Sequence, residues 1–197
     1  MKIIRKIKEV GLGNVIIGGI KRVKYTKLIK KYHFDEWHLS PYEWKEYAQV
    51  CVKYINAHPG RTVADIGCGL GGVLRHIRAD RRIGLDLHEE VIMAARELSD
   101  GTIVYKTGSF GELAERPVDY LITLNFMHGG TEAVWERPYR MAAERNDVRH
   151  FIVDTVPAKG ESHFLDWSRI LPDNYKRIER LGPFLGGRYV EIWEKIA

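Results

Sequence analysis

Cysteine is scarce in this chain of 197 residues, which contains only Cys51 and Cys68. Two cysteines cannot form a disulfide framework, so the sequence favours a reducing, cytoplasmic setting. No Cys/His spacing resembles a zinc site, and no apolar run reaches the roughly 18 residues of a membrane-spanning helix. The length allows one sizeable hydrophobic core and is too short for two ordinary enzyme domains.

Acidic residues are almost missing from the first 34 positions, where Glu9 stands alone. Ten basic residues accompany it, so this segment carries +9 while the whole chain carries +5 and the remainder −4. The basic residues are Lys2, Arg5, Lys6, Lys8, Lys21, Arg22, Lys24, Lys27, Lys30 and Lys31. We therefore divide the chain into a basic, aromatic extension and lid over residues 1–39 and a main domain over residues 40–197.

The basic extension has several possible partners. Residues 1–31 could make peripheral contact with the inner face of an anionic membrane, contact an anionic substrate, or pair with a second subunit in a homodimer. Packing of a few apolar side chains on the main domain is the simpler alternative.

The most informative stretch runs from Val63 to Leu74 and reads as a buried strand, a glycine turn and the start of a helix. Glycine permits backbone angles that a Cβ forbids, and it lets a ligand approach bare amide groups. Asp65 ends this strand, and Asp86 ends the next strand, where a carboxylate can accept hydrogen bonds from a ribose.

These residues resemble the first two motifs of the class I, Rossmann-like S-adenosylmethionine-dependent methyltransferases. The D-x-G-x-G-x-G pattern is matched at Asp65, Gly67, Gly69 and Gly71, and the acidic end of the second strand at Asp86. The resemblance implies a doubly wound α/β fold with a mostly parallel, seven-stranded sheet of order 3-2-1-4-5-7-6. It also implies a C-terminal antiparallel hairpin, here preceded by an N-terminal helical, basic extension.

Periodicity and capping signals predict the remaining elements. Ser40-Pro41-Tyr42-Glu43 reads as a capping box that begins a helix ending near His58. Further helices are expected after the glycine loop (Val73, Leu74, Ile77) and over 88–98, 131–144 and about 164–171. Further strands are expected over 82–87, 102–106, 118–126, 150–156, 175–181 and 188–194.

The resemblance also implies roles for individual residues toward S-adenosylmethionine. The glycine loop would hold the methionine end, Asp86 the ribose, and the position after the third strand the adenine. Ser109 stands where many relatives carry an acidic residue, and Phe110 either covers the adenine or begins a short helix as a core residue. The cofactor-binding prediction comprises Asp65, Gly67, Cys68, Gly69, Gly71, Asp86, Leu87, Ser109, Phe110 and Asn125.

Methyl transfer to a hydroxyl needs alignment and a base. His128, in the loop after the fourth strand, is the first candidate base and His38 the second. Trp37, His38 and Tyr42 are the candidate lid and substrate contacts. A catalytic metal is not expected, because Asp154 is the only carboxylate at the fourth and fifth strand ends.

The sequence thus predicts an S-adenosylmethionine-dependent methyltransferase that is O-directed toward a small molecule, a sugar or a lipid-linked glycan intermediate. RNA methylation is an alternative, although the net negative charge of the main domain argues against a nucleic-acid partner. A non-catalytic, cofactor-binding scaffold subunit and a nicotinamide-dependent oxidoreductase also stay open.

Overall fold

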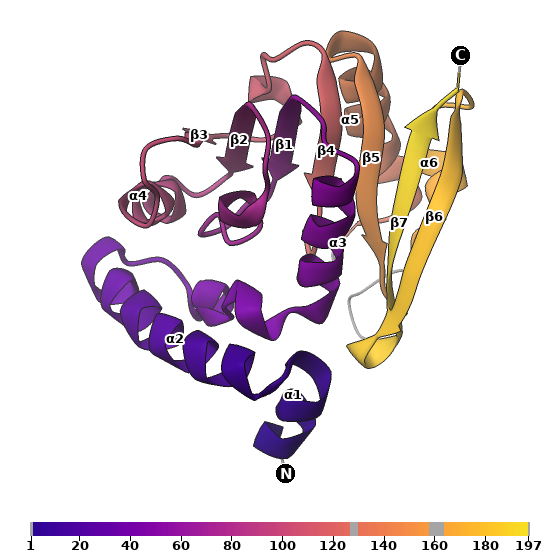
Figure 1. The fold of residues 1–197 in the computed structure, drawn as a ribbon. Helices are drawn as coiled ribbons and strands as arrows, with labels where there is room; N and C mark the ends of the chain where they lie inside the picture. The colour runs from indigo at the N-terminus through magenta and orange to yellow at the C-terminus, as the bar shows by residue number, and fades with distance from the viewer. Residues whose placement is uncertain (1, 127–129, 158–163, 197) are drawn as a thin grey trace.

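The computed structural model describes residues 2–126, 130–157 and 164–196. Seven strands form one sheet of order β3-β2-β1-β4-β5-β7-β6 (Figure 1). Neighbours from β3 to β5 are parallel, whereas β7 runs antiparallel to both β5 and β6. The strands are β1 Thr62–Ile66, β2 Arg81–Asp86, β3 Val104–Thr107, β4 Val118–Thr123, β5 Val148–Thr155, β6 Tyr175–Phe184 and β7 Arg188–Lys195. The predicted strand order and C-terminal hairpin are confirmed.

Helices cover both faces of the sheet, as expected of strands buried on both sides. On one face α3 contributes Cys51, Val52 and Ile55 to a core that α4 shares; on the other, α5 packs around Tyr139. The helices of the main domain are α3 Glu46–Ala57, α4 Glu89–Glu97, α5 Glu132–Arg145 and α6 Trp167–Ile170. The predicted helices near 88–98 and 131–144 are confirmed to within two residues.

The N-terminal extension forms two helices, α1 Lys2–Val10 and α2 Leu12–Tyr32. In Figure 1, α2 lies across the end of the sheet toward which β1, β2 and β4 point. Tyr25, Leu28 and Phe34 are buried and form a third core with Leu70 of the glycine loop and Val91 of α4. The extension therefore packs on the main domain, which was the simpler of the alternatives.

The helix expected to begin at the Ser40-Pro41 capping box and to end near His58 is confirmed at its end, where α3 stops at Ala57, but its predicted start is wrong. Short 3₁₀ turns cover Glu36–Leu39 and Tyr42–Trp44, and α3 starts only at Glu46. Tertiary contacts override the local signal: the Trp44 indole donates to the Val15 carbonyl oxygen at 3.3 Å, and Glu43 pairs with Lys21 instead of capping. Lys45 takes a non-helical backbone conformation between the two elements.

The helix expected after the glycine loop is also wrong, because only a 3₁₀ turn forms over Leu74–His76. Ile77 is already extended, and its side chain is buried in the core that α3 shares. The glycine loop therefore lacks the long helix whose N-terminus would add a dipole to the site.

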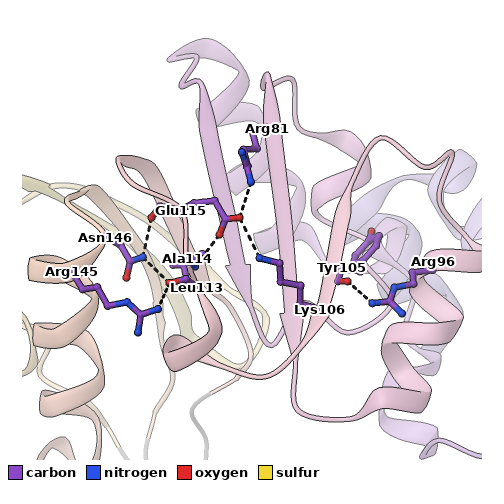
Figure 2. A network of polar contacts seen from close by, with 9 residues as sticks. All are labelled: Arg81, Arg96, Tyr105, Lys106, Leu113, Ala114, Glu115, Arg145 and Asn146. Carbon is purple, nitrogen blue, oxygen red and sulfur yellow. Dashed lines mark hydrogen bonds and ion pairs between the residues drawn. The ribbon is translucent and has the colours of Figure 1, made fainter.

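Behind the sheet edge, the loop between β3 and β4 is fixed by a polar network (Figure 2). The Glu115 carboxylate, 7% exposed, pairs with Arg81 at 2.9 Å and Lys106 at 3.4 Å. The Asn146 side chain donates to the carbonyl oxygens of Leu113 and Glu115, both at 2.9 Å. This network fixes the start of β4, the strand whose far end reaches the site described below.

Within the described residues, no helix has the length and apolar character needed to cross a membrane.

Candidate functional site

A cavity of about 690 Å³, including the part open to solvent, lies between the N-terminal extension and the carboxyl ends of β1 and β4. The glycine-loop cavity, as we call it, is lined by residues of both regions. They are Tyr25, Trp37, His38, Ser40, Tyr42, Lys45, Tyr47, Ala48, Asp65, Gly67, Cys68, Gly69, Leu70, Gly72, Val73, Leu124 and Asn125. Ligands of doubly wound folds bind at this end of the sheet.

The glycine loop follows β1 through left-handed backbone conformations. Gly67, Gly69 and Gly71 have φ of 74°, 52° and 69°, which explains why these positions are glycine. A Cβ on Gly67 would collide with the Phe126 ring, and one on Gly71 with the Tyr105 hydroxyl. The loop amides of Gly67 and Cys68 both donate to the carbonyl oxygen of Leu85, so the loop is tied to β2.

Asp86 lies at the end of β2, as predicted, and is 6% exposed. Its carboxylate accepts hydrogen bonds from the backbone N–H of Gly69 at 3.0 Å and of His88 at 3.2 Å. A carboxylate has about four lone-pair sites, so acceptor capacity is left for a ligand. Asp86 thus joins the glycine loop to the second strand end.

Asp65 and Lys45 form the charged floor of the cavity. Burial, together with the nearby Asp86 carboxylate, raises the pKa of Asp65 to about 8, against the opposing effect of Lys45. Burial and the Arg188 guanidinium lower the pKa of Lys45 to about 8. The Lys45 ammonium makes no hydrogen bond or salt bridge within the described part of the chain. A buried carboxylate that lacks a close cation is suited to receive one from a ligand.

The lid residues Trp37, His38 and Tyr42 all line the cavity. The His38 ring lies over the glycine loop, since a Cβ on Gly69 would be 3.1 Å from its Cδ2. His38 Nδ1 is 3.0 Å from the Asp35 carboxylate, which leaves Nε2 as the ring's free nitrogen. Tyr42 stacks on His76 with ring centroids 4.0 Å apart, which holds the lid against the glycine loop.

A second cluster lies where β4 and β5 end. Asn125 has a left-handed backbone (φ 60°), its N–H donates to the Asp154 carboxylate at 3.1 Å, and its side-chain oxygen accepts from Arg188 at 2.8 Å. Arg188 also pairs with Asp154, and its guanidinium lies 4.4 Å from the centroid of the Tyr47 ring. Burial lowers the pKa of Arg188. The cluster fixes the orientation of Asn125 at the cavity edge.

An outer groove continues from the glycine-loop cavity toward α1 and the β6–β7 hairpin, with about 1020 Å³ of space including its open side. The cavity and the groove share Trp37, Ser40, Lys45, Tyr47 and Asn125. The groove's other lining residues are Lys6, Glu9, Trp44, Glu46, Phe184, Leu185 and Arg188. The groove therefore combines aromatic rings with both cations and carboxylates, and Lys45 lines the groove and the cavity alike.

The structure brings most of the predicted site together around the cavity, but five predicted residues do not line it: Gly71, Asp86, Leu87, Ser109 and Phe110. Leu87 is 61% exposed, and Gly71 packs on Tyr105 without lining the cavity. Ser109 caps a 3₁₀ turn, and its backbone N–H donates a hydrogen bond to the Glu112 carboxylate at 2.7 Å. Phe110 is 4% exposed and packs on Tyr139, so the core interpretation of this residue holds.

His128 lies outside the described residues. No group of three or more His, Cys, Asp or Glu side chains within the described ranges is arranged to hold a metal ion.

Among the polar residues that line the cavity or the outer groove, the sequence analysis did not select Tyr25, Lys45, Tyr47 and Arg188. Lys45 was hidden by the wrong helix start, which made it an ordinary helix position, and Tyr47 was interpreted as part of the apolar face of the helix. Arg188 begins a strand far along the chain, and no local signal connects it to the glycine loop. Tyr25 had a usable signal, because it and Tyr32 are the two aromatic residues of an otherwise aliphatic and basic helix.

No protein-family model and no curated protein matches this chain. Solved structures do resemble it. The magnesium protoporphyrin IX methyltransferase of Synechocystis PCC 6803 with bound S-adenosylmethionine is 17% identical, with a TM-score of 0.66 over 92% of this chain and 96% of that one.

Two other solved structures show the breadth of the fold. Mitomycin 7-O-methyltransferase is 16% identical, with a TM-score of 0.58 over 76% of this chain and 52% of that one. A carbon methyltransferase is 13% identical, with a TM-score of 0.61 over 78% of this chain and 55% of that one. The chain has the fold of the class I, Rossmann-like S-adenosylmethionine-dependent methyltransferases. Fold likeness at these identities leaves the acceptor open.

Proposed function

We propose that this protein binds S-adenosylmethionine in the glycine-loop cavity and transfers its methyl group to an oxygen of a small molecule, a sugar or a lipid-linked glycan intermediate. The observation that carries the proposal is a cavity lined by Asp65 and Gly69 in a methyltransferase fold, with the Asp86 carboxylate hydrogen-bonded to the Gly69 backbone. The solved neighbour that contains bound S-adenosylmethionine supports the choice of cofactor.

The residues fit this cofactor chemically. The buried Asp65 carboxylate suits the ammonium of the methionine end, and the Asp86 carboxylate retains acceptor sites for ribose hydroxyls. Gly69 has no Cβ, so a ligand can approach its backbone beneath the His38 ring. When bound, S-adenosylmethionine supplies a methyl group on a positively charged sulfur.

His38 and His128 stay our candidate bases, and the geometry favours an experiment on His38. Asp35 accepts from Nδ1 and thereby orients the ring, so Nε2 can take the proton of an acceptor hydroxyl. The acceptor would enter through the outer groove, where Trp37, Trp44 and Tyr47 offer rings for stacking on a sugar or an aromatic compound. The oxygen would then attack in line while Trp37 and Tyr42 restrict water.

The cofactor is tested by calorimetric titration with S-adenosylhomocysteine and, separately, with NADH. Asp86→Ala should weaken S-adenosylhomocysteine binding by about 100-fold, because it removes two charged hydrogen bonds of about 1.5 kcal/mol each or more. The matched control is Asp80→Ala, an exposed aspartate one residue before the start of the same strand, which should bind like the wild type. Binding of NADH alone would assign the fold to a dehydrogenase and end the proposal.

The acceptor is tested with labelled methyl donor on a panel of phenols, sugars and lipid-linked sugars. His38→Asn should reduce turnover by about 100-fold or more, whereas the exposed His58→Asn should leave it unchanged. Transfer to RNA instead would favour the nucleic-acid alternative. Cofactor binding without transfer to any class would favour the scaffold alternative.

A further inference from the structure

Helix α2 has one face buried against the main domain and an opposite face that is exposed. Gly18, Tyr25 and Leu28 are its buried residues and face the main domain. At about 100° of rotation per residue, the opposite face carries four large aliphatic residues. They are Leu12 (58% exposed), Ile16 (55%), Ile20 (68%) and Val23 (61%). We call this set the outer face of α2. Such a row of exposed aliphatic side chains is unusual on a protein surface facing only water.

The same face becomes basic toward the end of the helix. The side chains of Lys24, Lys27 and Lys30 are exposed, and their ammonium groups make no hydrogen bond or salt bridge within the described residues. Lys27 and Lys30 continue the angular position of Ile16 and Val23, and Lys24 borders it. Aliphatic side chains and exposed lysines thus occupy one continuous strip.

We propose that the outer face of α2 lies on an anionic membrane surface, with its aliphatic side chains among the lipid headgroups and its lysines on the phosphates. This combination of a helix lying in the interface and flanking lysines is how amphipathic helices bind anionic lipid. Nucleic acid would use the lysines and leave the aliphatic row without a partner. The inference does not depend on the proposed methyl transfer.

The orientation has a consequence for the site. Tyr25 lies on the buried side of the same helix and lines the glycine-loop cavity. The cavity would therefore lie about 10 Å, one helix diameter, from the membrane surface. An acceptor carried by a lipid could reach such a cavity without leaving the membrane.

The experiment is flotation of the full-length protein with phosphatidylcholine vesicles, with and without about a third of phosphatidylglycerol. We expect binding to the anionic vesicles and at least about tenfold weaker binding to the neutral ones. The triple variant Ile16→Ser, Ile20→Ser, Val23→Ser should bind at least about tenfold more weakly. The variant Lys24→Gln, Lys27→Gln, Lys30→Gln should do the same, at about fivefold per lysine.

The matched control is Val134→Ser, a 58% exposed aliphatic residue on α5, which should bind like the wild type. Absence of binding to anionic vesicles would overturn the proposal, as would full binding by the serine variant. Sedimentation velocity measures the oligomeric state. A wild-type dimer that dissociates in the serine variant would mean that the outer face of α2 binds a second copy of the chain and not a membrane. RNA binding that the glutamine variant loses and the serine variant keeps would assign it to nucleic acid.

Discussion

Replacing Asp65 with asparagine should stabilise the folded protein and weaken cofactor binding at the same time. The side chain is 3% exposed, and its pKa is raised from 3.8 to about 8, chiefly by burial. The unfolded chain releases this proton near pH 4, whereas the folded chain keeps it until near pH 8. Stability from this group is therefore complete below about pH 4 and is lost as the pH rises toward 8.

The magnitude follows from proton linkage. Each pH unit between the two pKa values costs the wild type about 1.4 kcal/mol of unfolding free energy relative to Asp65→Asn. From pH 5 to pH 7.5 the difference should thus grow by about 3 kcal/mol, or about 6 to 12 °C in Tm for a chain of this length. Lys45 does not contribute to this slope, because its lowered pKa of about 8 keeps it protonated in both states below that range.

The assay is urea unfolding of both proteins at several pH values from 5 to 7.5, with Asp80→Asn as the exposed control. The control should show no growing difference from the wild type. A constant difference between Asp65→Asn and the wild type would mean that Asp65 is already ionised in the free fold, which would refute the argument from burial. S-adenosylhomocysteine should bind the variant at least about tenfold more weakly, since a charged hydrogen bond contributes about 1.5 kcal/mol or more.

Three further substitutions test the packing around the site. Gly71→Ala should lower the unfolding free energy by about 2 to 4 kcal/mol, because the position has a positive φ and its Cβ would meet the Tyr105 hydroxyl; adding Tyr105→Phe should restore part of it. Arg188→Met should cost about 3 kcal/mol in urea unfolding by leaving the Asp154 carboxylate buried and unpaired, and Asp154→Asn in the same chain should recover much of this. Gly18→Ala should weaken S-adenosylhomocysteine binding in calorimetry. The added Cβ would collide with the Trp44 indole ring and displace α2, which carries Tyr25 of the cavity lining.

Much of the fold could be predicted because its signals are local. Alternating and continuous apolar runs defined the strands, and Gly67, Gly69 and Gly71 needed left-handed backbone that few other residues adopt. The carboxyl ends of parallel strands lie at the same end of a sheet. The sequence alone therefore placed Asp65 and Asn125 at a common site.

The errors came where distant contacts decide local structure. The capping box at residues 40–43 is a good helix signal by itself. In the fold, however, Glu43 pairs with Lys21 of α2, and the Trp44 indole donates a hydrogen bond to the Val15 carbonyl oxygen. No short-range rule contains those partners. Similarly, Arg188 reaches Asn125 only because β7 inserts between β5 and β6.

The N-terminal extension and the main domain are not independent structural units, because both contribute residues to the site. His38 comes from residues 1–39, Asp65 from the main domain, and both line one cavity. The third core joins Tyr25 and Leu28 of α2 to Leu70 of the glycine loop, so removing the extension would expose apolar surface as well as open the cavity. The extension therefore forms one wall of the site. The binding free energy of any cofactor beneath His38 is accordingly coupled to the free energy of packing α2 on the main domain. Cofactor affinity and the docking of α2 should accordingly rise and fall together.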